Sequence, residues 1–178
     1  CSNGSGLSPD VERTKRAIEL IKRLAKVEAK RFKVSGEKPT KMSDADAVKI
    51  SREKGRLAMQ YVRAKDYKNA AKLYEEIAPL DETTQAWNLK EAASAMLKMD
   101  NKKAALRLAL AAEEAPAEAR NDQMTHYFER HMGDIFMQLD EPKKAIPHYN
   151  IAVEKTKIEG YVKDTKSALQ EAIEKAGE

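Results

Sequence analysis

Several residue types that mark whole classes of protein are scarce in this sequence. Its 178 residues include one cysteine, seven glycines and six prolines, and 6% of them are aromatic. A single cysteine excludes an internal disulfide framework, and no apolar run approaches the roughly 18 residues that a membrane-spanning helix needs. With so few Gly and Pro residues, long stretches lack breakers, which argues against a fold of many short strands.

Those stretches are rich in Ala, Leu, Glu, Lys, Gln and Met, which are strong helix formers. The hydrophobic share of 42% is enough for a packed core, whereas disordered chains combine few apolar residues with a large net charge. Here the formal net charge is only +4, although 35% of the residues are charged. We therefore expect an all-α fold, either one domain or a short array of helical repeats.

The start of the chain resembles a mature bacterial lipoprotein, because Cys1 is followed by a Gly/Ser-rich run. In that family the N-terminal cysteine bears the lipid, and several acyl chains together give a stable anchor. The resemblance implies a flexible tether over residues 1–8. It also implies an outer-membrane lipoprotein of the bacterial cell envelope that faces the periplasm or the cell surface. The alternative is a chain boundary that happens to fall at a cysteine, in a cytoplasmic protein.

A basic amphipathic helix is predicted over residues 9–33. Ser8 can cap it, Pro9 suits its first turn, and apolar residues recur mostly at steps of three and four. Its basic face contains Lys22, Arg23, Lys26 and Arg31. One interpretation is binding to anionic lipid headgroups, nucleic acid or an acidic partner. The favoured interpretation is a solvated face, because the basic residues alternate with Glu and lack aromatic partners.

A recurring pattern of small and aromatic residues follows the linker at residues 34–43. Its first copy has Ala58 and Ala70 where two helices would cross closely, and Tyr61 and Tyr74 beside the crossing. This pattern resembles the tetratricopeptide repeat, a pair of antiparallel helices with a small residue at their crossing. The resemblance implies that such pairs stack side by side into a superhelix.

Two further copies extend the resemblance. The second is aligned on Ala104, and it departs from the family at Glu91 and Ala95. The third is aligned on Ala145 and contains Pro147, where a proline removes a backbone hydrogen bond and is expected to kink the helix. Because the interval from the second copy to the third is the longer one, we expect additional residues between those two pairs.

The resemblance thus implies a tetratricopeptide-repeat superhelix, an α-solenoid of about three helix pairs, over residues 44–178. The basic helix would precede this repeat domain as an extra N-terminal helix. A capping helix is predicted over residues 161–176, because an open last repeat would leave apolar surface in water.

Signals of catalytic chemistry are weak. The sequence has no Gly-rich phosphate loop, nucleophile elbow or dinucleotide fingerprint. His126 and His131 are five residues apart, whereas zinc-binding helices place two ligands four apart on one face. We therefore expect no catalytic residue, no metal site and no cofactor, and we interpret these two histidines and His148 as ordinary, partly exposed side chains.

Arrays of this family present a concave groove lined by the first helix of each pair, and the resemblance implies that this groove binds protein partners. Phasing from the resemblance nominates these lining residues: Arg52, Met59, Arg63, Leu89, Ala93, Met96, Tyr127, Arg130, Asp134 and Met137. A groove with methionines in every repeat adapts to an extended or helical peptide, and its arginines suit acidic groups on that peptide. The alternative is that some of these methionines belong to the core.

The function implied is a non-enzymatic protein-interaction scaffold, tethered to a membrane, that binds or stabilises subunits of a larger assembly. No small-molecule substrate is expected. Two alternatives stay open at this point. One is an untethered soluble adaptor or an integral accessory subunit of a complex, and the other is a protein that binds an anionic surface, either lipid or nucleic acid, through its basic helix.

Overall fold

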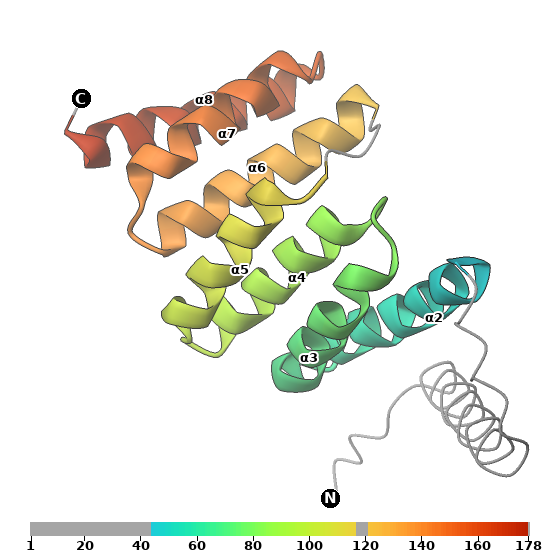
Figure 1. The fold of residues 1–178 in the computed structure, drawn as a ribbon. Coiled ribbons are helices and arrows are strands. Elements are labelled where there is room, and N and C mark those ends of the chain that lie inside the picture. Colours follow the sequence, from blue (N-terminus) through green and yellow to red (C-terminus); the bar gives the residue numbers. More distant parts are fainter. Residues whose placement is uncertain (1–43, 117–120, 178) are drawn as a thin grey trace, which may run out of the picture.

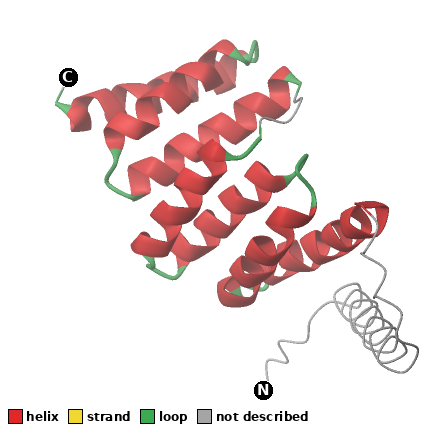
Figure 2. Cartoon of the chain, viewed as in Figure 1, coloured by secondary structure: helices red, strands yellow, loops and turns green. Residues whose placement is uncertain are grey.

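The computed structural model describes residues 44–116 and 121–177. Within these ranges the chain forms seven α-helices and a short 3₁₀-helix, with no strand among them (Figure 2). The lipid attachment predicted at Cys1, the basic helix over residues 9–33 and the linker lie outside the described residues. The same is true of the whole predicted basic face: Lys22, Arg23, Lys26 and Arg31.

The described helices follow one another as stacked pairs (Figure 1). The first pair is α2 (Asp44–Arg63) and α3 (Tyr67–Ile77), and the short helix η1 (Ala78–Leu80) follows it. The second pair is α4 (Gln85–Lys98) and α5 (Lys102–Glu114), and the third is α6 (Asp122–Gln138) and α7 (Pro142–Glu154). The last helix, α8 (Glu159–Ala176), packs on α7. The expectation of an all-helical array built from helix pairs is therefore confirmed.

The same tight turn joins the two helices of every pair. It contains a residue with left-handed backbone, and φ is 59° at Lys65, 56° at Asp100 and 61° at Asp140. In the first two pairs the next residue caps the second helix, because the Asp66 carboxylate and the Asn101 amide oxygen accept a backbone N–H from three residues ahead. These equivalent turns define the register of the three copies without reference to any sequence pattern.

By this register the equivalent small residues of the second helices are Ala70, Ala105 and Ala145, and all three are fully buried. The sequence alignment of the second copy on Ala104 was therefore wrong by one residue, and Ala104 is only half-buried. A pattern of small residues cannot distinguish Ala104 from Ala105, because both are alanine. The position of the left-handed turn shows that Ala105 is the residue equivalent to Ala70 and Ala145.

The corrected register also places a small residue at every crossing within a pair: Ala58, Ala93 and Gly133. Ala58 and Ala93 are fully buried. The large residue beside the crossing is Tyr61 in the first pair, Met96 in the second and Phe136 in the third. The departure assigned to Ala95 is therefore a consequence of the shifted alignment, and a methionine occupies the aromatic position of the second pair.

One hydrophobic cluster of buried residues extends from Ala58 in α2 to Ala172 in α8, and buried Leu57 belongs to a second, small cluster. Two of the largest fully buried members of the first cluster, Phe136 and Tyr149, come from the third pair. Pro147 faces solvent, and α7 continues through it as one helix from Pro142 to Glu154. The stacking of the pairs thus buries one side of each helix and leaves the other side available.

Candidate protein-binding surface

The groove residues predicted on α2 are all exposed. Arg52, Met59 and Arg63 follow one another at steps of seven and four, which places them on one face of the helix. Met59 retains 47% of its accessible surface, a large value for an apolar side chain. Neither arginine has an ion-pair partner in the part of the chain that the structure describes. This face therefore presents an apolar side chain between two cations.

The residues predicted on α4 are much less accessible. Ala93 is fully buried where α4 crosses α5, so its place is in the core and not on a groove. Leu89 and Met96 are half-buried and pack against the core. In the corrected register the α4 residues equivalent to Arg52 and Met59 are Trp87 and Ser94, and both are half-buried.

On α6, Tyr127 is exposed, whereas Arg130, Asp134 and Met137 are half-buried. Arg130 forms an ion pair with Asp134, and its guanidinium lies 5.0 Å from the ring centroid of Tyr149. The Tyr149 hydroxyl donates a hydrogen bond of 2.9 Å to Asp134. Arg130 and Asp134 are thus already engaged within the third pair, so an acidic ligand would compete with Asp134 for the arginine.

Sequence reasoning missed a polar cluster between α4 and α6, centred on Lys90. This lysine is only 2% exposed. Its Nζ donates to Glu91 Oε1 at 2.7 Å, lies 2.9 Å from His131 Nδ1, and sits 4.0 Å from the ring centroid of Trp87. Trp87 in turn contacts the ring of Phe128, with centroids 6.1 Å apart. The pairing with Glu91 and the position over the indole compensate for the burial of the charge.

The residues around His131 favour the neutral form of this histidine. Burial contributes most to lowering its pKa, and the positive charge of Lys90 comes next. Glu91 acts in the opposite direction, and the more distant Arg130 and Lys98 lower the pKa further, so that it falls to about 4. His131 is therefore neutral at pH 7, and its Nδ1 accepts the hydrogen bond from Lys90.

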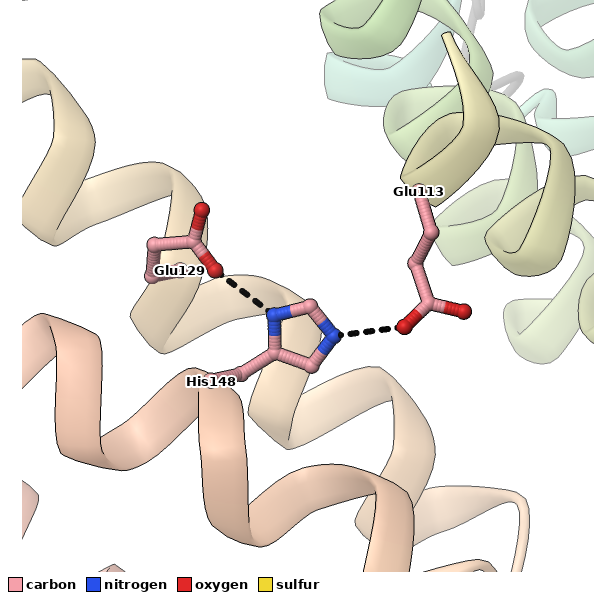
Figure 3. Close-up of polar contacts among 3 residues, drawn as sticks. All are labelled: Glu113, Glu129 and His148. Carbon is pink, nitrogen blue, oxygen red and sulfur yellow. Dashed lines mark hydrogen bonds and ion pairs between the residues drawn. The ribbon is translucent and has the colours of Figure 1, made fainter. Parts of the chain in front are cut away.

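A second polar cluster surrounds His148, where three helices meet (Figure 3). The Nδ1 atom of His148 lies 2.6 Å from Glu129 Oε2 on α6, and its Nε2 lies 3.1 Å from Glu113 Oε1 on α5. The imidazole stacks on Phe136, with ring centroids 5.4 Å apart and an interplanar angle of 13°. Both ring nitrogens face carboxylate oxygens, so the imidazolium form, which has a hydrogen on each nitrogen, can donate to both glutamates.

The two glutamates shift the ionisation of His148. Burial taken alone lowers the pKa of this histidine, but the hydrogen bonds and negative charges of Glu129 and Glu113 together outweigh it. The pKa of His148 is therefore raised above its usual value. The pKa values of His131 and His148 are thus shifted in opposite directions, although both side chains lie between the second and third pairs.

The expectation of partly exposed histidines is wrong for His126 and His148, which are buried. The Nδ1 atom of His126 lies 2.9 Å from the carbonyl oxygen of Ala152, and its ring stacks on Tyr161. No group of three or more metal-ligating side chains occurs in the described ranges. Spacing along the chain could not have revealed these clusters, because Glu113, Glu129 and His148 come from three different helices.

Exposed apolar side chains gather where α6 and α8 begin. The Tyr127 hydroxyl donates to the Tyr161 hydroxyl at 3.2 Å, and the two rings make an edge-on contact. Met124 and Ile158 lie one turn before these tyrosines, and both are exposed. Tyr127 is the one predicted groove residue in this group.

A cavity of about 430 Å³ lies between the first and second pairs. Leu89, Leu108 and Ala111 are among its apolar lining residues. An ion pair of 2.7 Å between Arg107 and Glu75, which also line it, joins α5 to α3. Of the predicted groove residues on α4, Leu89 thus contributes both to the lining of this cavity and to the packing against the core.

None of the helices in residues 44–116 and 121–177 has the length and apolar character needed to cross a membrane.

Over 96 residues the chain is 33% identical to anaphase-promoting complex subunit 3 of Schizosaccharomyces pombe. The matched part is 54% of this chain but only 13% of that protein. No protein-family model matches the chain.

Proposed function

We propose that this chain is a tetratricopeptide-repeat protein that acts as a non-enzymatic scaffold and binds protein partners through the exposed surface of its first helices. The observation that carries the proposal is the threefold recurrence of one helix pair, with the same left-handed turn and a small residue at each crossing. Stacked pairs of this kind form an extended surface on which a partner can lie. Similarity to a subunit of the anaphase-promoting complex supports a role within an assembly.

The chemistry of α2 indicates the kind of partner. Met59 is a flexible apolar side chain, and methionine adapts to differently shaped apolar residues. Arg52 and Arg63 lie on the same face, and guanidinium groups bind carboxylates with two parallel hydrogen bonds. We therefore propose a peptide segment that combines apolar and acidic residues, with its apolar side chain over Met59.

A peptide-display selection tests this function. The intact chain is screened against random 15-residue peptides, and the expected result is enrichment of sequences with Asp or Glu beside Leu, Ile or Phe. Met59→Glu should lower the affinity for the selected peptides at least tenfold. The double variant Arg52→Glu/Arg63→Glu should lower it by a similar factor. Lys72→Glu, an exposed change on α3, serves as the matched control. Absence of enrichment, or equal binding by Met59→Glu and the control while helicity is retained, would contradict the proposal.

The lipid attachment at Cys1, the location in a bacterial cell envelope and the cytoplasmic alternative concern residues outside the described ranges and stay predictions. The intact mass of protein isolated from its native source tests them. Acyl chains on Cys1 would add several hundred daltons, and an unmodified cysteine would favour the untethered adaptor.

A further inference from the structure

Three polar contacts of described residues that involve a charged side chain cross the interface between the second and third helix pairs. Lys90 on α4 meets His131 on α6, as described above. Glu113 on α5 meets His148 on α7 at 3.1 Å. The third contact is an ion pair of 2.6 Å between Lys102, at the start of α5, and Asp140, in the turn after α6. Two of the three contacts thus depend on a histidine, the side chain whose charge changes nearest neutral pH.

The two glutamates around His148 differ in where they come from. Glu129 belongs to α6, in the same pair as His148, whereas Glu113 lies across the interface on α5. The Glu129 contact is the shorter one, and the Glu129 side chain is 15% exposed against 34% for Glu113. When the imidazole has a single proton, that proton therefore stays on Nδ1, where it donates to the more buried carboxylate.

Loss of the other proton changes the contact across the interface. A neutral imidazole donates from one nitrogen only, so its Nε2 then presents a lone pair to the Glu113 carboxylate. Two acceptors in contact, one of them negatively charged, repel each other. Deprotonation therefore preserves the contact within the third pair and removes the contact between the two pairs.

We propose that the second and third helix pairs are joined through a proton-controlled contact, in which protonated His148 holds α5 against α7 and its deprotonation lets α5 move away from α7 at this point. The charged groups that act on His148 are Glu129 of α6 and Glu113 of α5. His131 faces Lys90, Glu91 and Lys98 of α4 and Arg130 of its own helix. The pKa of His131 is about 4, so a change at neutral to alkaline pH does not come from this histidine. The inference concerns the shape of the array and does not depend on peptide binding.

The test measures the separation of the two pairs while the charge of His148 is followed independently. Spin labels are attached at Lys103→Cys on α5 and Asn150→Cys on α7, both exposed positions, in the 178-residue chain with the change Cys1→Ser. The label distance is recorded from pH 5 to pH 9.5, and NMR of the histidine ring protons reports the titration of His148. The expected result is a distance that lengthens or broadens as His148 loses its proton, with a midpoint above 6.5.

Two variants distinguish the loss of the Glu113–His148 contact from a general effect of removing a negative charge. In Glu113→Gln the amide can donate to the neutral ring or accept from the protonated one, so the distance should not change with pH, and the pKa of His148 should fall. Glu114→Gln, an exposed neighbour on α5, removes the same charge and should behave as the wild type. A constant distance in the wild type while His148 titrates overturns the proposal, as does an identical response of the two variants or a midpoint at or below 6.5.

Discussion

The ring of Tyr149 lies so close to Gly133 that a Cβ atom added at this glycine would be 2.4 Å from the nearest ring carbon. The glycine is on α6 and the tyrosine on α7, so the contact sets how closely the third pair packs. Tyr149 is fully buried and its hydroxyl donates to Asp134, which prevents the ring from moving aside freely.

Gly133→Ala should therefore destabilise the protein. Overpacking of a core contact costs about 1–3 kcal/mol, and a Cβ atom 2.4 Å from the ring places Gly133→Ala in the upper part of that range. This cost exceeds the gain of about 1 kcal/mol from replacing a helical glycine by alanine. Gly55→Ala is the matched control, because its Cβ would lie 3.6 Å from Ile77, an ordinary contact. Urea unfolding followed by circular dichroism should show a loss of stability for Gly133→Ala and a gain for Gly55→Ala. Equal stability changes would contradict the close packing.

The register of the second pair predicts different tolerances at two neighbouring alanines. Ala105→Leu places extra atoms in a fully buried site and should cost about 1–3 kcal/mol of unfolding free energy. Ala104→Leu adds a good helix former at a half-buried site and should change stability by less than about 1 kcal/mol. The urea midpoints of unfolding of the two variants measure these costs. A larger loss of stability for Ala104→Leu than for Ala105→Leu would support the register aligned on Ala104.

Lys90→Met should raise the pKa of His131. The charge of Lys90 is the second contribution, after burial, that lowers this pKa to about 4, and methionine removes the charge while it keeps most of the volume. NMR titration of the histidine ring protons measures the change. An unaltered pKa would mean that Lys90 does not face the ring as described. Stability should fall, because the change removes one partner of a buried polar contact and leaves Glu91 and the Nδ1 atom of His131 without their donor.

The dependence of folding stability on pH should have two limbs. His148 has a raised pKa in the folded state, so its contribution is fully present below about 6.5 and is lost as pH rises through the folded value. His131 has a lowered pKa, so its contribution is present above about 6.5 and is lost as pH falls toward 4.

Urea unfolding at a series of pH values should show these limbs. In His148→Gln the decline at high pH should be reduced, and in His131→Gln the decline at low pH should be reduced. Each variant is the control for the other, because it leaves the opposite limb in place. If either variant altered the wrong limb, the assignment of the two charge states would be incorrect.

The helix pairs could be predicted from the sequence because their signals are local. Helix formers fill the elements, and the short turns contain polar residues such as Asp66 and Asn101 that cap the following helix. The alignment failed at Ala104, where two adjacent alanines make the pattern ambiguous. The same error explains why Ala93, a residue of the helix crossing, was assigned to the groove.

The polar clusters between the second and third pairs could not be predicted in this way. Lys90 looks like any surface lysine of an amphipathic helix until α6 packs beside it and Trp87 covers it. His148 acquires its two carboxylates from helices that begin more than a helix length away in the chain. Whether a charged side chain is exposed or buried at such an interface depends on how the pairs stack, which the order of residues within one helix does not reveal.

Trp87 is the only tryptophan of the chain, and it lies between α4 and α6 with Lys90 over one face and Phe128 beside it. The tryptophan fluorescence of the whole protein, excited selectively, therefore comes from one side chain between the second and third pairs. Binding of a peptide, a proton or a neighbouring subunit changes the emission spectrum when it alters the surroundings of the indole ring. The unlabelled protein thus has its own optical probe at the place where its helix pairs meet.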